Sequence, residues 1–319
     1  MNKVYPCALL ALVVTSGAFA QNYPAKSIRL VLPYPPGGGT DVIARPLAQK
    51  LTENLGQQVI VDNRGGAGGN IGMELVAKSP PDGYTLLFAL TAQYAVNPSL
   101  YPKLAYDPAR DYAPISLLAN APYLLVVHPS LPAKSVAGLI ALVKARPGQL
   151  AYSSSGNGSG AHLAGEMLRS LARLDITHVP YKGAGPAMPD LIAGQVQLSF
   201  VTYTAAGPHI KTARLRALGV TTARRSPTLP ELPAIAETVP GYDSAVWYGF
   251  AAPAGTPVEI VARLNSEVLR VLAAPDFRTR ITLEAVAPIG SSPEEFGNFI
   301  KSEIVRWAKV VKDSGAKVD

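Results

Sequence analysis

The apolar residues of the chain follow two periods that alternate along its length. Short apolar runs bounded by turn residues, such as 27–32, predict buried strands. Apolar residues at every third or fourth position predict helices, and Ile43, Leu47 and Leu51 form one such stripe. Neither period persists over 94–111, which predicts an irregular loop. The other strands are expected over 59–61, 85–90, 122–128, 150–152, 177–179, 196–201, 215–220 and 245–252, and the helices over 41–55, 70–78, 162–171, 186–193 and 257–272, after Ser135, and from Ser292 towards Val311.

This alternation predicts an α/β fold in which mainly parallel sheets carry helices on both faces. A chain of 319 residues is long enough for two domains with separate cores. We expect the chain to cross to the second domain near 119–123 and to return near 242–247. The first domain is then discontinuous and comprises 21–121 plus 246–319, and the second comprises 122–245.

The N-terminal residues have the pattern of an export signal. Lys3 gives a positive start, 8–14 form a short apolar run, and 18–20 read as an A-x-A cleavage site. We therefore predict a cleaved signal peptide over 1–20 and a mature protein in the periplasm. The single cysteine, Cys7, lies inside this segment, so the mature chain can form neither a disulfide nor a thiolate metal site.

The charge of the chain argues against one class of partner. Lysine and arginine number 29 against 22 acidic residues, which gives a formal net charge of +7. The excess is spread out in small clusters such as Arg224 with Arg225, and no basic run carries interleaved aromatic residues. We therefore expect no nucleic-acid partner, whereas a modest positive field suits small anions.

The most informative segment is Pro33–Asp41, with the sequence P-Y-P-P-G-G-G-T-D, between a strand and an amphipathic helix. Glycines have no Cβ, so their amides can approach a ligand closely. The first amides of the helix, at Thr40, Asp41 and Val42, have no partner within the helix and lie at the positive end of its dipole. Such a loop binds an anion without a cationic side chain. It predicts a carboxylate cradle.

Other strand-to-helix loops repeat this chemistry. Serines and glycines make up most of Ser153–His162, which again joins a strand to a helix, so a ligand held between the two loops would meet donors from both domains. A surface loop without a ligand is the alternative interpretation. Lys182 could form an ion pair with the distal carboxylate of a ligand. The alternative is a turn lysine that only solvent contacts. The glycine-rich segment 63–70 is a common kind of loop and gives a weaker signal.

Motifs for catalysis and cofactor binding are missing. Ser159 does not stand in G-x-S-x-G because Asn157 replaces the first glycine, and Ala161 breaks G-x-G-x-x-G. His162 and Glu166 are four residues apart, but no further ligand stands at a motif spacing, which favours a surface contact over a metal site. We therefore predict no enzyme activity, no cofactor and no metal.

Several segments together resemble the Bug-type extracytoplasmic solute receptors, the binding components associated with tripartite tricarboxylate transporters. The match covers the chain that follows the predicted signal peptide. Its motifs are specific in combination and weak singly. They are Pro33–Asp41, Asn63–Gly72, Asp82–Leu87, Ser154–Leu163, Val179–Gly183 and Asp190–Gln195.

The resemblance implies a type II periplasmic-binding-protein fold, in which two lobes close around a carboxylated metabolite held in the cleft between them. It also implies a monomer. Trp247 and Tyr248 each have a second interpretation, since an aromatic residue at the predicted return between the domains either closes over a ligand or fills a core. The ligand-binding residues that the resemblance implies are Tyr34, Gly38, Thr40, Asp41, Thr91, Ala92, Ser154, Gly156, Ser159, Lys182, Thr202 and Trp247.

One departure from the family pattern bears on the ligand. Many relatives carry an aspartate after the phenylalanine that corresponds to Phe200, and Val201 follows it here. An acid at that place could bind a ligand ammonium. Its absence favours a ligand without positive charge.

We therefore expect a periplasmic solute-binding protein that captures a small organic anion by hinge closure and delivers it to the subunits of a membrane transporter. The anion is a mono-, di- or tricarboxylate or an aromatic acid. Two alternatives stay open. A receptor that presents its ligand to a sensor kinase has the same sequence features, and an exported hydrolase working at Ser153–Ser159 is disfavoured by the missing spacing of nucleophile and base.

Overall fold

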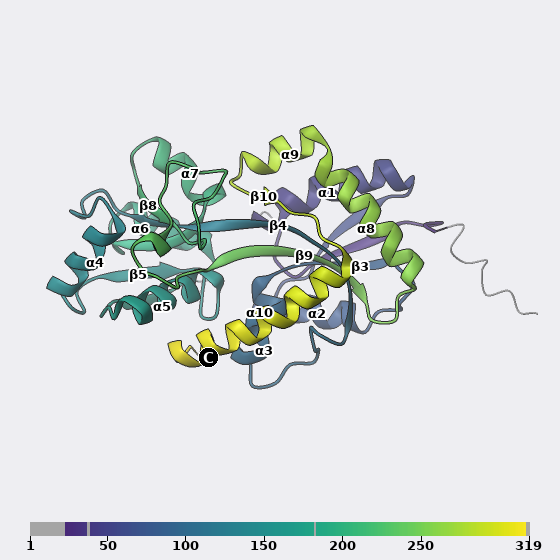
Figure 1. Cartoon of the computed structure of the whole chain (residues 1–319), viewed down its shortest axis with the longest axis horizontal. Helices are drawn as coiled ribbons and strands as arrows, with labels where there is room; N and C mark the ends of the chain where they lie inside the picture. The colour runs from purple at the N-terminus through teal and green to yellow at the C-terminus, as the bar shows by residue number, and fades with distance from the viewer. Residues whose placement is uncertain (1–22, 37–38, 182, 317–319) are drawn as a thin grey trace, which may run out of the picture.

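The structure, a computed structural model, describes residues 23–36, 39–181 and 183–316. Figure 1 shows two lobes side by side, joined by the long strands β4 (Tyr112–Val127) and β9 (Ala245–Pro253). We call the body that contains β1 to β3 lobe 1 and the body that contains β5 to β8 lobe 2. The strands form one ten-stranded sheet in the order β2-β1-β3-β9-β4-β7-β5-β6, and β8 and β10 both pair with β4. Within these ranges, every helix is too short or too polar to span a bilayer.

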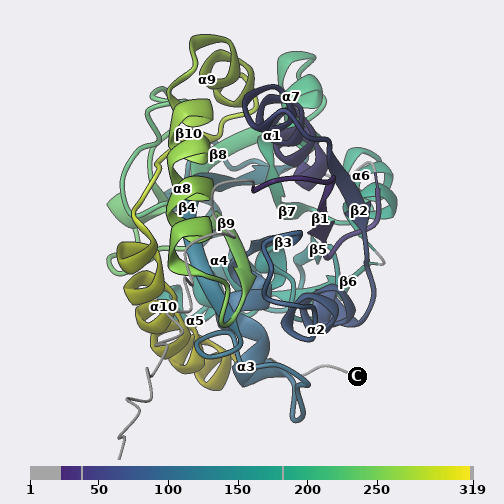
Figure 2. The same cartoon turned by 90° about the vertical axis from the view of Figure 1, so that its right-hand side faces the viewer.

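Lobe 1 carries helices on both faces of its strands. The strand β1 is parallel to β2 and β3, and successive side chains of a strand point to opposite faces. Leu30 accordingly packs in the core under α1 and α8, and Val31 packs in the core under α2 and α10. Figure 2 shows α1 and α2 on opposite sides of these strands. The elements are β1 (Ile28–Leu32), α1 (Gly39–Leu55), β2 (Val59–Asn63), a 3-10 turn (Ala67–Gly69), α2 (Asn70–Ala77), β3 (Thr85–Leu90), α8 (Val258–Ala273), α9 (Pro275–Thr282), β10 (Ala287–Pro288) and α10 (Pro293–Ser314).

Lobe 2 is built in the same way around β5, which is parallel to β6 and β7. Leu125 and Tyr152 belong to the core under α4 and α5, and Leu124 and Val126 belong to the core on the other face, under α6 and α7. The elements are α4 (Val136–Ala145), β5 (Ala151–Ser154), α5 (Gly160–Ala172), β6 (Thr177–Pro180), α6 (Ala184–Ile192), β7 (Leu198–Thr202), α7 (Tyr203–Lys211), β8 (Arg216–Val220) and a 3-10 turn (Ile235–Glu237).

The two joining strands are antiparallel to each other and to their neighbours. Their ladder runs from the pair of Tyr112 with Pro253 to the pair of Pro122 with Ala245, and β4 then continues between β7 and β8. The prediction of mainly parallel sheets therefore holds for the outer strands of each lobe and not for the middle. The predicted crossing at 119–123 lies inside β4, and the predicted return at 242–247 contains the first residues of β9.

Some local predictions were wrong. The expected loop 94–111 begins with a π-helical turn, Ala92–Val96, followed by α3 (Asn97–Leu100). Most residues of this segment are buried. The sequence did not predict it because turns of four and five residues are too short to show a helical period. The strand expected over 122–128 begins ten residues earlier, at Tyr112. Two register shifts in its first half break the alternation of apolar and polar positions.

The helix α10 links both lobes through a buried carboxylate. The helix packs against α3 of lobe 1 and α5 of lobe 2. Both tryptophans of the chain donate their indole N–H to Glu303 Oε2, Trp247 at 2.8 Å and Trp307 at 3.1 Å. Arg306 donates to Glu303 Oε1 at 2.6 Å and to the carbonyl of Asp243 at 2.8 Å. Glu303 thereby fixes α10 to the start of β9.

A second buried polar cluster lies in lobe 2. The rings of His162 and His178 stack with centroids 4.0 Å apart, and Tyr152 stacks on His178 at 4.8 Å. Tyr152 donates to Glu166 Oε1 at 2.7 Å, and Arg169 forms an ion pair with Glu166. The expected surface contact of His162 with Glu166 is therefore wrong, because α5 turns this face towards the sheet and leaves the two residues 5 % and 4 % exposed.

Removal of the Glu303 carboxylate should destabilise the fold. Glu303→Ala leaves two indole N–H groups and the Arg306 guanidinium without their acceptor, and we expect the free energy of unfolding to fall by about 3 kcal/mol. Urea denaturation followed by circular dichroism measures it. The matched control is Glu294→Ala, an exposed glutamate on the same helix, for which we expect a change within about 0.5 kcal/mol. Equal effects of the two substitutions would contradict the role of Glu303.

The histidine stack should make stability depend on pH. Burial, and then the Arg169 cation, lower the pKa of His162 from 6.5 to about 4, and burial, and then His162, lower the pKa of His178 to about 4. Between these values the unfolded chain takes up protons that the folded chain excludes, so the free energy of unfolding falls as the pH drops from 6.5 to about 4.

Denaturation curves at several pH values in this window test the effect of the stack. His178→Gln should flatten the dependence of stability on pH, since one of the two depressed groups is gone. His209→Gln, which removes a histidine outside the stack, is the matched control. The same slope in His178→Gln and in the unchanged protein would refute the assignment.

Candidate functional site

The predicted residues of lobe 1 gather where α1 begins. Thr40 and Asp41 lie in the first turn of α1, and both are 7 % exposed. Asp41 forms an ion pair with Arg45 at 2.9 Å and accepts from Asn63 Nδ2 at 3.5 Å, so its charge is balanced within lobe 1. The amide of Thr40 has no acceptor among the described residues. Gly38 lies outside the described residues.

Tyr34 is held by a polar network that sequence analysis missed. Its hydroxyl lies 2.9 Å from Gln93 Oε1 and 2.7 Å from Gln93 Nε2. Gln93 also donates to the carbonyl of Gly68 at 2.8 Å, and Asn97 donates to the same carbonyl at 3.2 Å. Burial raises the pKa of Tyr34 well above its usual range, so the phenol stays protonated. The glycine-rich segment 63–70 therefore helps to position Tyr34.

Two predicted residues at the end of β3 face the hinge. Thr91 Oγ1 accepts from the backbone N–H of Trp247 at 2.8 Å, which ties β3 to β9, and Ala92 begins the π-helical turn. The indole of Trp247 is 2 % exposed and stacks on Tyr94 at 5.5 Å. It fills the core, as its second interpretation held, and we leave it out of the site because no face of the ring is open to a ligand.

The predicted serines of lobe 2 shape their own loop. Ser154 Oγ lies 3.1 Å from the amide of Gly156 and 2.7 Å from His178 Nε2. Ser159 caps α5, because its Oγ accepts from the amide of His162 at 3.2 Å. The free donors of this loop lie slightly further along the chain than predicted. The amides of Gly160 and Ala161, in the first turn of α5, have no acceptor in the part of the chain that the structure describes.

The contact of Ser154 with His178 brings together a hydroxyl and an imidazole that are 24 residues apart. Sequence spacing could not reveal this pair, because the pairing of β5 with β6 creates it. Ser154 is 2 % exposed and its oxygen is shared with the Gly156 backbone. The pair therefore supports the loop from inside lobe 2. Among the described residues, no group of three or more histidine, cysteine, aspartate or glutamate side chains is placed to hold a metal ion.

The lobes meet around a narrow cavity of about 10 Å³, which has room for about one water molecule. Val42 of α1 borders it from lobe 1, and Thr202 and Tyr203 border it from lobe 2. Thr202, one of the predicted ligand-binding residues, thus borders a cavity between the lobes. A second inter-lobe contact joins the side chain of Leu100 to Gly158, whose φ of +73° suits glycine. Lys182 lies outside the described residues.

Two tyrosines, Tyr248 with its two interpretations and Tyr123 at the predicted crossing, come from the joining strands. Tyr248 of β9 lines the narrow cavity together with Ala121 of β4, and the Tyr123 hydroxyl lies against Gly160 at the start of α5. Because they lie on the strands between the lobes, both rings belong to the floor of the cleft. A tyrosine at a predicted hinge was the only signal for them in the sequence.

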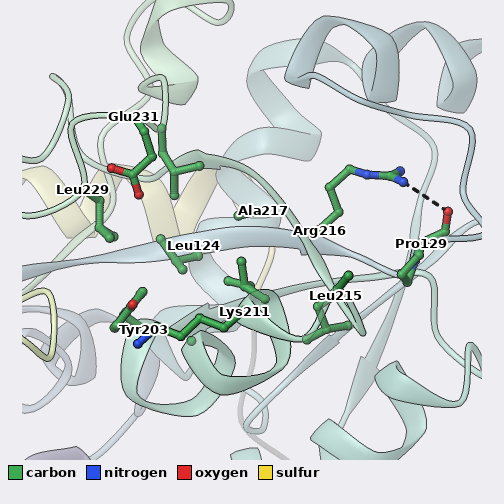
Figure 3. A pocket seen from close by; sticks show the side chains of 13 residues that line it. Leu124, Pro129, Tyr203, Lys211, Leu215, Arg216, Ala217, Leu229 and Glu231 are labelled. Atoms are coloured by element: carbon green, nitrogen blue, oxygen red, sulfur yellow. Dashed lines mark hydrogen bonds between the residues drawn. The ribbon is translucent and has the colours of Figure 1, made fainter.

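A wider pocket of lobe 2 lies elsewhere. Figure 3 shows this pocket of about 550 Å³ beside α7 and β8, lined by Leu124, Leu215 and other apolar side chains. Arg216 lies at its edge and donates to the carbonyls of Leu131 at 3.2 Å and Ala133 at 3.1 Å. Backbone carbonyls thus already bind its guanidinium. None of the predicted ligand-binding residues lines this pocket.

Comparison with known proteins shows the family. The model described as "Tripartite tricarboxylate transporter family receptor" matches residues 43–316. BugT of Bordetella pertussis is 38 % identical over 325 residues, with 100 % of both chains covered. A protein of Pseudomonas sp. strain P51 from the tcbD-tcbE intergenic region is 40 % identical over 304 residues, which cover 94 % of this chain and 90 % of that one.

Solved structures agree with this match. The structure of R. palustris Rpa4515 with adipate is 41 % identical, has a TM-score of 0.85, and covers 92 % of this chain and 99 % of its own. The structure of MatC from Rhodopseudomonas palustris with bound malate is 33 % identical, has a TM-score of 0.81, and covers 91 % of this chain and 100 % of its own. They confirm the expected periplasmic-binding-protein fold. The chain therefore belongs to the tripartite tricarboxylate transporter receptor family, whose members are solute-binding proteins rather than enzymes.

Proposed function

We propose that this receptor is exported to the periplasm by a cleaved signal peptide over 1–20, binds a small dicarboxylate between its lobes, and delivers it to a membrane transporter as a monomer. The observation that carries the proposal is the pair of helix starts where the lobes meet. The amides of Thr40 in α1 and of Gly160 and Ala161 in α5 have no acceptor among the described residues. Oriented amides at helix starts bind carboxylates.

The ligands of the relatives support the choice of a dicarboxylate. Two of their structures contain adipate and malate, which are acids without an ammonium group. No aspartate follows Phe200 in this chain. Its absence agrees with a ligand that carries no positive charge between its two carboxylates. Each hydrogen bond to a charged group contributes about 1.5 to 3 kcal/mol. A few amides and hydroxyls therefore suffice for the roughly −8 kcal/mol of micromolar binding.

Hinge closure follows from how the two lobes are joined. Within the described ranges, β4 and β9 are the strands that run between the lobes, and α10 packs against both lobes. A ligand that accepts hydrogen bonds from α1 and α5 at once stabilises the closed arrangement by the difference between its affinities for the closed and open states. We propose that the residues of β4 and β9 between the lobes absorb this motion, and that the transporter binds the closed form.

Thermal shift with a panel of carboxylates tests the ligand class. We expect a few dicarboxylates to raise the melting temperature by about 5 °C at a hundredfold excess over their dissociation constant. The diamide or dimethyl ester of each active acid is the matched control and should give no shift, because it lacks the charge. A panel of mono-, di- and tricarboxylates and aromatic acids without any active compound would refute the proposed function.

Closure can be tested separately at Gly158. In Gly158→Ala the added Cβ overlaps with the side chain of Leu100 across the lobes, so the closed state is disfavoured and we expect ligand to bind about tenfold more weakly. The matched control is Gly194→Ala. Its φ of +75° imposes the same backbone strain as the +73° of Gly158, but its Cβ would stand 3.4 Å from the His128 ring, an ordinary contact.

A second substitution identifies the cause. Leu100→Ala in the Gly158→Ala background removes the overlap and should restore most of the affinity. Calorimetric titration with the strongest acid of the panel measures each variant. Normal affinity in Gly158→Ala, or no recovery in the double variant, would show that this contact does not limit closure.

A further inference from the structure

The turn from Gly156 to Gly158 leads into α5 and is held from inside lobe 2 by two histidines. The amide of Gly158 donates to Nδ1 of His162 at 3.0 Å. The amide of Gly156 donates to Ser154 Oγ at 3.1 Å, and the same oxygen lies 2.7 Å from Nε2 of His178. The two imidazole rings stack nearly parallel, at an angle of 12°. One pair of rings therefore anchors the turn at both ends.

The chemical state of His162 suits this contact. Burial, and then the Arg169 cation, lower the pKa of His162 to about 4, so the ring is neutral near neutral pH. A neutral imidazole has one nitrogen that donates and one that accepts. Since Nδ1 accepts from an amide, the proton lies on Nε2. The acidic neighbour of the ring, Glu166, binds Tyr152 and Arg169.

The other side of the turn faces lobe 1. A Cβ on Gly158 would overlap with the side chain of Leu100, so Gly158 is enclosed between a histidine of its own lobe and a leucine of the other. The amides of Gly160 and Ala161, which have no acceptor among the described residues, follow directly. A shift of the turn would therefore displace the contact between the lobes and the start of α5 together.

We propose that His162 and His178 are positioning residues for ligand binding, which fix the turn from Gly156 to Gly158 in the shape that lets the lobes close over a ligand. They act through the turn and not by contact with the ligand. This inference rests on the proposed function and adds to it residues that set the affinity from inside lobe 2. Without the rings the turn occupies other shapes, and the apparent affinity falls in proportion to the lost fraction of the competent shape.

Two substitutions of His162 separate the contact from the ring. The side-chain oxygen of asparagine stands as many bonds from Cα as Nδ1 of histidine does, so His162→Asn keeps an acceptor for the Gly158 amide. The amide group of glutamine corresponds to Nε2 instead, so His162→Gln loses that acceptor. Both variants lose the stacked ring. They therefore differ mainly in the contact with Gly158.

Calorimetric titration with adipate, malate or the strongest acid of the panel above measures the effect, at a temperature at which circular dichroism shows each variant to be folded. We expect His162→Asn to bind within about twofold of the unchanged protein and His162→Gln to bind about tenfold more weakly, because the Gly158 amide then has no acceptor. His209→Gln, outside the stack, should bind normally.

The same pair of substitutions at His178 is the crossed test. The contact of His178 with Ser154 runs through Nε2, so the expected order is reversed: His178→Gln keeps the affinity and His178→Asn weakens it. A role of the rings in stability alone predicts no such reversal. If one variant does not fold, the pair at the other histidine still decides.

Hydrogen exchange of the ligand-free protein, followed by NMR, gives a readout that needs no ligand. The Gly158 amide is protected while His162 accepts from it. We expect its exchange rate to be similar in His162→Asn and about tenfold higher in His162→Gln. Weaker binding by His162→Gln without faster exchange at Gly158 would refute the role of this contact.

The outcomes separate this inference from the function on which it rests. If no acid of the panel binds the unchanged protein, the proposed function fails, and the role of the histidines in binding fails with it. If an acid binds the unchanged protein, and the asparagine and glutamine variants at each histidine bind it equally, the function stands and the positioning role is refuted. The reversed order at the two histidines, with fast exchange in His162→Gln, supports it.

Discussion

The antiparallel ladder of β4 and β9 is the constraint on which the rest of the structure depends. These two strands belong to the sheets of both lobes, so they fix the lobes on a common floor and leave a twist of the two strands as the simplest relative motion. They also place Tyr248 beside Val42 of α1 and Tyr123 beside Gly160 of α5. A receptor with the same loops on separate, unpaired connectors would have no fixed floor against which to bind a ligand.

Polar side chains and backbone amides have different roles in the loops between the lobes. Side chains that looked like ligand donors in the sequence mostly hold the loops: Ser159 caps α5, Ser154 contacts His178, and Thr91 ties β3 to β9. Among the described residues, backbone amides at the starts of α1 and α5 are left without an acceptor. Neutral, fixed donors of this kind bind an anion without moving a long cationic side chain, which keeps the entropic cost of binding low.

The sequence predicted the fold better than the site, for a physical reason. The predicted and observed limits of β3 agree at 85–90 because a continuous buried run has a strong signal, and the helix stripes of α1 and α8 are equally regular. β4 was half missed because register shifts break its period. Long-range contacts decided the site residues: the burial of Trp247 under α10, the stack of His162 with His178, and the approach of Tyr123 to Gly160 all join segments far apart in the chain.

The same long-range contacts couple the cleft to two helices at the surface. Glu303 fixes α10 to the beginning of β9 through Trp247, while the far part of α10 packs against α5. The start of α5 is also the proposed contact for the ligand carboxylate. A rotation that brings α5 towards the ligand must therefore move α5 against α10, since α10 cannot follow without breaking a buried carboxylate from its donors. In the closure proposed above, occupancy of the cleft therefore changes the position of α5 relative to α10.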